Sequence, residues 1–97
     1  MSAYVLVEVE VENPEGYAEY RPLAHESVAK YGGRFLVRGG KTEAWEGEWL
    51  PRIVVLEFES LEAAHAWYYS DDYQAASAIR HQHSRARMIA VEGTAAP

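Results

Sequence analysis

The sequence predicts an α+β fold in which helices cover one face of a four-stranded antiparallel sheet. Residues 3–12 place valine at every second position from 5 to 11, opposite a mixed face that is apolar at Leu6 and acidic from Glu8 onward, which is typical of a strand with one buried face. Residues 14–31 repeat apolar side chains at helical spacing, which indicates an amphipathic helix. Residues 51–59 are the most apolar stretch, as expected of a central strand. Together these segments favour the element order β-α-β-β-α-β.

The first helix has a clear beginning, interruption and end. Asn13 and Pro14 suit the N-cap and the first helical position. Pro22 lacks a backbone N–H, so we expect a kink or restart near Arg21. Gly32-Gly33 suits a left-handed C-cap. On a helical wheel, the side chains that share an arc of about 80° and should face the core are Tyr17, Tyr20, Ala24, Val28 and Tyr31.

The middle of the chain predicts a short strand followed by an excursion. Residues 34–40, RFLVRGG, read as a strand that two glycines end. Residues 41–49 read as an extra, hairpin-like excursion that Gly47 closes, before the apolar strand begins.

The second half predicts a split helix and a last strand. Ser60 suits the cap of a helix over 61–69, and Ser70 suits the cap of another over about 71–82. Residues 84–93 read as the final strand. The complete order is that of the ferredoxin-like split βαβ arrangement, which places strands one and three in the centre of the sheet. We expect one domain over 1–93 and a disordered tail over 94–97.

The sheet face away from the helices predicts a homodimer. With helices on one side only, this face carries charged residues among apolar side chains, and burial against a second copy in a C2 dimer would cover it. Its expected apolar members are Leu6, Leu36, Ile53, Val55 and Ile89.

Charge and composition argue against several classes of function. The 97 residues carry 15 acids against nine bases, for a net charge of −6, which disfavours a nucleic-acid-binding protein. No apolar run reaches the roughly 20 residues that a membrane span needs, and the N-terminal residues do not resemble a signal peptide, so we expect a cytoplasmic protein. The absence of cysteine excludes disulfides, thiolate metal sites and cysteine nucleophiles.

Several short motifs follow one another in a specific order. They are FLVRGG at 35–40, WEG at 45–47, RIVVLEF at 52–58, AWYYSDDYQ at 66–74, Arg80, and VEG at 91–93. In this combination the chain resembles the family catalogued as domain of unknown function 1330. The resemblance implies a ferredoxin-like subunit that pairs as a dimeric α+β barrel. The wider superfamily includes cofactor-free monooxygenases, isomerases and haem-dependent enzymes, but the resemblance implies no specific reaction.

The aromatic cluster at residues 67–73 has two interpretations. Trp67 and Tyr73 could cover the joint between the two halves of the split helix, with their polar edges in water. Alternatively, they could form the wall of a cleft between helices and sheet. Arg38, Arg52 and Arg80 could converge on such a cleft, and arginines bind carboxylates bidentately.

An aromatic-walled cleft with arginines would suit a small aromatic or enoic acid. The opposing interpretation is that Arg52 forms a structural ion pair with Glu46 or Glu57. Glu57 is also a candidate general base if it lies with Glu8 on the sheet face away from the helices. It could instead be neutralised there by Arg87 or Arg38.

His25, on the flank of the first helix's apolar stripe, is a second candidate proton carrier. The sequence does not predict a metal site or a cofactor, since His81 and His83 point about 200° apart on a helix. A single haem or metal ligand at His25 or His65 is a less favoured alternative.

Two hypotheses on function follow. In the first, a dimeric barrel binds a small acidic or aromatic metabolite through Arg38, Arg52, Trp67 and Tyr73, with cofactor-free catalysis as an option. In the second, the protein is a non-enzymatic dimeric scaffold or regulatory module, whose cleft is filled by side chains.

Overall fold

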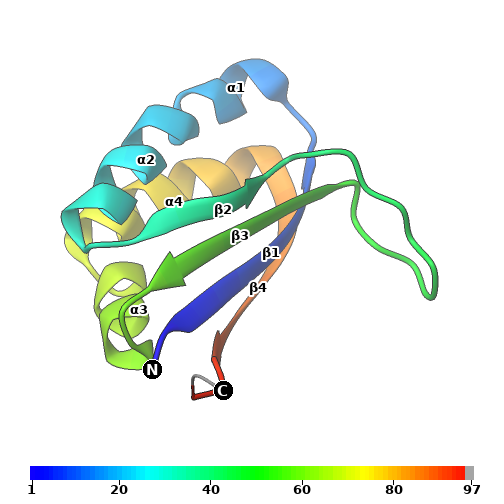
Figure 1. Cartoon of the computed structure of the whole chain (residues 1–97). Coiled ribbons are helices and arrows are strands. Elements are labelled where there is room, and N and C mark those ends of the chain that lie inside the picture. The colour runs from blue at the N-terminus through cyan, green and yellow to red at the C-terminus, as the bar shows by residue number, and fades with distance from the viewer. Residues whose placement is uncertain (96–97) are drawn as a thin grey trace.

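The computed structural model describes residues 1–95 and contains one antiparallel sheet with helices packed on one of its faces (Figure 1). The strand order is β2-β3-β1-β4, so the first and third strands are central, as predicted. The predicted disordered tail, 94–97, lies partly outside the described residues. The strands are β1 (Ala3–Val11), β2 (Arg34–Arg38), β3 (Arg52–Phe58) and β4 (Ser84–Glu92). The helices are α1 (Pro14–Ala18), α2 (Tyr20–Lys30), α3 (Leu61–Tyr68) and α4 (Asp71–His83).

The first predicted helix is interrupted, as expected, but at Glu19 rather than near Arg21. Pro22 then lies in the first turn of α2, where a missing N–H breaks no intrahelical hydrogen bond. The Asn13 side chain caps α1 by accepting a 3.3 Å hydrogen bond from the Gly16 N–H. Gly32 ends α2 with φ +76°, the left-handed conformation expected there.

The predicted split of the second helix is confirmed, because serine caps both halves. Ser60 Oγ accepts a hydrogen bond from the Ala63 N–H at 3.0 Å and begins α3. Ser70 Oγ accepts from the Tyr73 N–H at 3.1 Å and donates to the Trp67 carbonyl at 2.7 Å. One hydroxyl therefore ends α3 and begins α4.

The core lies between the inner face of the sheet and the helices. Alternate residues of the two central strands supply its sheet side, including Val5, Val9 and Phe58. Trp67 is 1% exposed, and its indole N–H donates to Ser27 Oγ at 3.0 Å. Neither interpretation of the aromatic cluster predicted that the Trp67 indole would be fully buried.

A β-bulge in β2 changes which side chains face the helices. Phe35 pairs with Leu56, but Val37 pairs with Val55, so Leu36 is an extra residue on its strand. Arg38 consequently lies opposite Val54, an inward-facing residue of β3. Simple alternation from Phe35 would have turned Arg38 outward.

The outer face of the sheet carries apolar residues and ion pairs. Leu6, Ile89 and Val91 are exposed there. On the same face, Arg87 binds Glu8 at 2.8 Å across β4 and β1, and Arg34 binds Glu57 at 2.6 Å across β2 and β3.

The excursion predicted at 41–49 is present as part of a long loop between β2 and β3, which projects from the body of the molecule (Figure 1). It contains no strand, but Gly47 makes a turn at φ +80°, and Trp45 and Trp49 are exposed. Among residues 1–95, no helix is long and apolar enough to cross a membrane.

Candidate ligand-binding site

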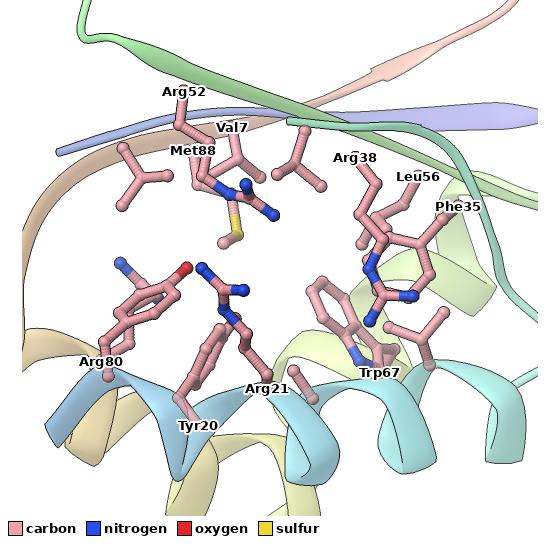
Figure 2. Close-up of a pocket in the computed structure, with 15 residues that line it drawn as sticks. Val7, Tyr20, Arg21, Phe35, Arg38, Arg52, Leu56, Trp67, Arg80 and Met88 are labelled. Atoms are coloured by element: carbon pink, nitrogen blue, oxygen red, sulfur yellow. The ribbon is translucent and has the colours of Figure 1, made fainter. Parts of the chain in front are cut away.

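A cavity of about 330 Å³ lies between the inner face of the sheet and the helices. This volume falls within the range of small-molecule sites, about 300–1,000 Å³. Figure 2 shows side chains from the sheet on one side and from the helices on the other. The lining residues are Val7, Val9, Tyr17, Tyr20, Arg21, Ala24, Val28, Phe35, Arg38, Arg52, Val54, Leu56, Trp67, Arg80 and Met88.

Four arginines line the cavity, each from a different element. Arg38 comes from β2 and Arg52 from β3, whereas Arg21 comes from α2 and Arg80 from α4. The guanidinium groups of Arg52 and Arg21 point toward each other from the sheet side and the helix side (Figure 2). The folded chain thus brings together four positive charges that are far apart in sequence.

None of these four arginines has a carboxylate partner within residues 1–95, and the lining contains no acidic residue. The ion pair of Arg52 with Glu46 or Glu57, the opposing interpretation of the sequence, is not present among residues 1–95. Of the other five basic side chains, four form ion pairs and Lys41 lies in the long loop. Those four are Lys30 with Asp72, Arg34 with Glu57, Arg85 with Glu10, and Arg87 with Glu8.

Arg52 depends on the glycine that follows Arg38. Its Nε is buried and has no hydrogen-bond partner in the described chain. A Cβ placed on Gly39 would lie 2.0 Å from Arg52 Nη1, and Gly39 itself has φ +74°. The first glycine of the RGG motif therefore leaves room for the Arg52 guanidinium and adopts a backbone conformation that other residues rarely adopt.

Arg80, which is 4% exposed, begins a hydrogen-bond chain to the cavity. Its Nε donates to Tyr73 Oη at 3.3 Å, and Tyr73 Oη lies 2.8 Å from Tyr20 Oη. Because Arg80 can only donate and Tyr73 is fully buried, the Tyr73 O–H must donate to Tyr20. The Tyr20 O–H is then free to donate to a bound molecule. Burial raises the pKa of Tyr20 further above its usual value, so this hydroxyl keeps its proton.

Aromatic rings hold the remaining two guanidinium groups. Arg38 Cζ lies 4.1 Å from the centroid of the Phe35 ring, and Arg21 Cζ lies 5.5 Å from that of Tyr17. Burial raises the pKa of Tyr17, against the opposing charges of Arg52, Arg21 and Arg80. These three arginines and Tyr17 line the same cavity, while Arg38 lies beside Phe35.

Three of the four ligand-binding residues predicted from the sequence, Arg38, Arg52 and Trp67, line the cavity. Tyr73 lies behind the lining, where it connects Arg80 to Tyr20. Sequence reasoning assigned Arg21 only to a helix restart. A signal was available, because Arg21 follows Tyr17 by four residues and therefore shares its face, which is the inward stripe of the helix.

The two candidate proton carriers, His25 and Glu57, lie outside the cavity lining. The His25 ring stacks on Phe35, with centroids 5.9 Å apart. Glu57 lies on the outer face, where the hydrogen bond from Arg34 holds its pKa below the usual value. Its partner is Arg34, and not Arg87 or Arg38. Within residues 1–95, no three histidine or carboxylate side chains gather to hold a metal ion.

Comparison with family models identifies the family of this chain. The model of a family described as Domain of unknown function (DUF1330) matches residues 2–94. No curated protein matches the chain.

Three solved structures are similar at low sequence identity. A protein of unknown function from Rhodopseudomonas palustris has a TM-score of 0.76 and 18% identity, covering 98% of this chain and 84% of that one. A dimeric ferredoxin-like protein of unknown function from a Jannaschia species has a TM-score of 0.74 and 15% identity, covering 96% and 100%. SnoaB, a cofactor-independent oxygenase from Streptomyces nogalater, has a TM-score of 0.67 and 9% identity, covering 98% and 95%. These similarities establish the ferredoxin-like fold.

Proposed function

Since the chain belongs to the DUF1330 family, whose description states no activity, we propose a function from the cavity itself: this protein binds a small organic anion. The ligand is an acidic metabolite with an aromatic or unsaturated body. It lies between the sheet and the helices, against Arg38, Arg52 and Trp67.

The observation that carries the proposal is that four arginines without a carboxylate partner among residues 1–95 line one cavity of an acidic protein. Guanidinium groups that lie close together without counter-charges repel one another, and a bound anion offsets this electrostatic repulsion. Arginine also binds carboxylates through two parallel hydrogen bonds, which fixes their orientation. The buried, unpartnered Nε of Arg52 and the free O–H of Tyr20 add two further donors for ligand oxygens.

The proposal extends to cofactor-free turnover of the bound anion. One protein of similar fold is named a cofactor-independent oxygenase. In this chain Tyr20 lines the cavity and is placed to stabilise negative charge on a bound molecule through a hydrogen bond from its O–H. His25 and Glu57, the two candidate proton carriers, both lie outside the lining.

We further propose that the protein is a cytoplasmic homodimer paired through the outer face of the sheet. Leu6, Ile89 and Val91 supply apolar area there, and the dimeric relative from Jannaschia has the same fold. The alternative function, a non-enzymatic dimeric scaffold, would need a filled cleft. The cavity of about 330 Å³ favours ligand binding over that alternative.

Native mass spectrometry of the purified protein, followed by a thermal-shift screen, tests the proposal. We expect a dimer, and we expect small carboxylates to stabilise the protein while their neutral amides do not. Arg52→Ala should weaken binding roughly 10- to 100-fold, the effect of losing a charge-assisted hydrogen bond. The matched control is Arg34→Ala, which removes an arginine from the opposite face and should leave affinity unchanged. Equal affinity in both variants would contradict the proposal.

A further inference from the structure

We infer that the ligand carries two anionic groups joined by an apolar segment, one bound by Arg21 and Arg52 and the other by Arg38. This inference rests on the proposed function, because it concerns the same cavity. It adds the number of charges on the ligand, their arrangement and the residue that recognises the second charge.

The first anionic position is the group of arginines around Tyr17. Arg21 lies over the Tyr17 ring, and the charges of Arg52 and Arg80 also act on the Tyr17 phenol. Arg80 is buried and held by Tyr73 and Ser77, so its charge reinforces this position from behind. Arg21 and Arg52 face the cavity with free donors (Figure 2). This end therefore has enough positive charge to bind a complete carboxylate.

The second position is Arg38. Its Cζ lies 4.1 Å from the centroid of the Phe35 ring, a cation–π contact that positions the guanidinium and leaves its N–H groups available. In Figure 2, Arg38 lies with Phe35 on one side of the cavity, and Arg80 lies on the other. Because Arg38 is exposed, its anionic partner would lie near the cavity mouth.

The surface between these positions is apolar. Val7, Leu56 and Met88 line it from the sheet, which suits a hydrocarbon or aromatic segment. A monoanion would leave one of the two arginine positions without a counter-charge. A ligand ammonium group would find no carboxylate in the lining, so zwitterionic amino acids are disfavoured.

The test compares dicarboxylates with esters that keep their shape and lose one charge. Probes are the linear series from succinate to suberate and terephthalate, each measured beside its monomethyl ester by isothermal titration calorimetry. At least one diacid should bind about tenfold more tightly than its ester, as expected for one additional charge-assisted pair. Arg38→Gln should remove this preference, so that the diacid binds no more tightly than its ester. Arg52→Gln should weaken diacid and ester alike, and Arg34→Gln should change neither.

The outcomes separate this inference from the proposed function. If diacids and esters bind equally in every pair, the two-charge inference is wrong and the single-anion function stands. A diacid preference that survives Arg38→Gln overturns the assignment of Arg38. If no carboxylate binds the folded wild-type protein, both proposals fail. Circular dichroism of each variant distinguishes loss of binding from loss of folding.

Discussion

The two faces of the sheet use arginine in opposite ways. On the outer face, Arg34, Arg85 and Arg87 each bind a glutamate of a neighbouring strand. On the inner face, Arg38 and Arg52 have no carboxylate partner among residues 1–95, although the chain carries 15 acidic residues. Acidic residues are therefore available to the fold, but the cavity lining excludes them.

This difference separates structural arginines from candidate functional ones. An outer-face arginine and its glutamate neutralise each other, so the pair offers little to a ligand. An inner-face arginine has no such partner among residues 1–95, so its donors stay free to bind an anion at the cavity. The lack of a carboxylate partner, rather than the presence of arginine as such, distinguishes the candidate site. The following predictions compare the two faces, beginning with the largest expected effect.

Truncation of apolar side chains should affect the two faces very differently. Phe58, on the inner face, is 1% exposed and its ring lies 5.3 Å from that of Trp67. Phe58→Ala should lower the free energy of unfolding by about 3–5 kcal/mol. Ile89, on the outer face, is 63% exposed. Ile89→Ala should therefore change the free energy of unfolding of the monomer by less than about 0.5 kcal/mol.

Urea unfolding at several protein concentrations checks this comparison. A dimer that buries Ile89 should make the effect of Ile89→Ala grow with protein concentration. If Ile89→Ala strongly lowers the free energy of unfolding at concentrations where the protein is monomeric, the two faces are equally buried within one chain.

A pair of neighbouring glycines tests the space around Arg52. Gly39→Ala introduces a Cβ at the Arg52 guanidinium and a strained positive φ, whereas nothing lies within 4 Å of a Cβ at Gly40. Gly39→Ala should cost about 1–2 kcal/mol of stability and should also weaken carboxylate binding, because Arg52 must move. Gly40→Ala should leave both the melting temperature and the carboxylate affinity measured by calorimetry nearly unchanged. Equal effects would show that Arg52 does not depend on the backbone of β2.

Acid should weaken the ion pairs on the outer face of the sheet. Hydrogen bonds from the Leu50 N–H and from Arg87 lower the pKa of Glu8, and Arg34 lowers that of Glu57, from 4.5 in both cases. Carboxyl groups with lowered pKa values stabilise the folded state above pH 4.5 and lose that contribution as the pH falls through the folded values.

Melting temperatures measured from pH 7 to pH 3 should therefore decline at the acidic end, and less steeply in the double variant Glu8→Gln and Glu57→Gln. High salt should reduce the difference between the two proteins, because exposed pairs are screened. Identical pH profiles would mean that these pairs contribute nothing to stability.

Elements whose signals are local in sequence could be predicted. Asn13, Ser60 and Ser70 each bond to a backbone N–H three residues ahead, so the sequence shows both partners together. Strand alternation likewise predicted the inner face of β1. The predicted break in the first helix was misplaced only because Pro22 can occupy a first turn.

Features that depend on strand register could not be predicted. The bulge at Leu36 exists only in the pairing of β2 with β3, and it is the bulge that turns Arg38 inward. The same register puts Arg34 opposite Glu57, a partner that sequence reasoning did not consider. Burial of the Trp67 indole depends on Ser27, a hydrogen-bond partner on another helix.

The concentration of unpaired positive charge in one cavity also affects which anions can approach. The chain as a whole carries a net charge of −6, so its overall field opposes the approach of a polyanion. A small anion experiences the arginines once it comes within a screening length of about 8 Å at physiological ionic strength. Under the proposed function, the acidic exterior would act as a size filter that favours anions small enough to fit within the cavity.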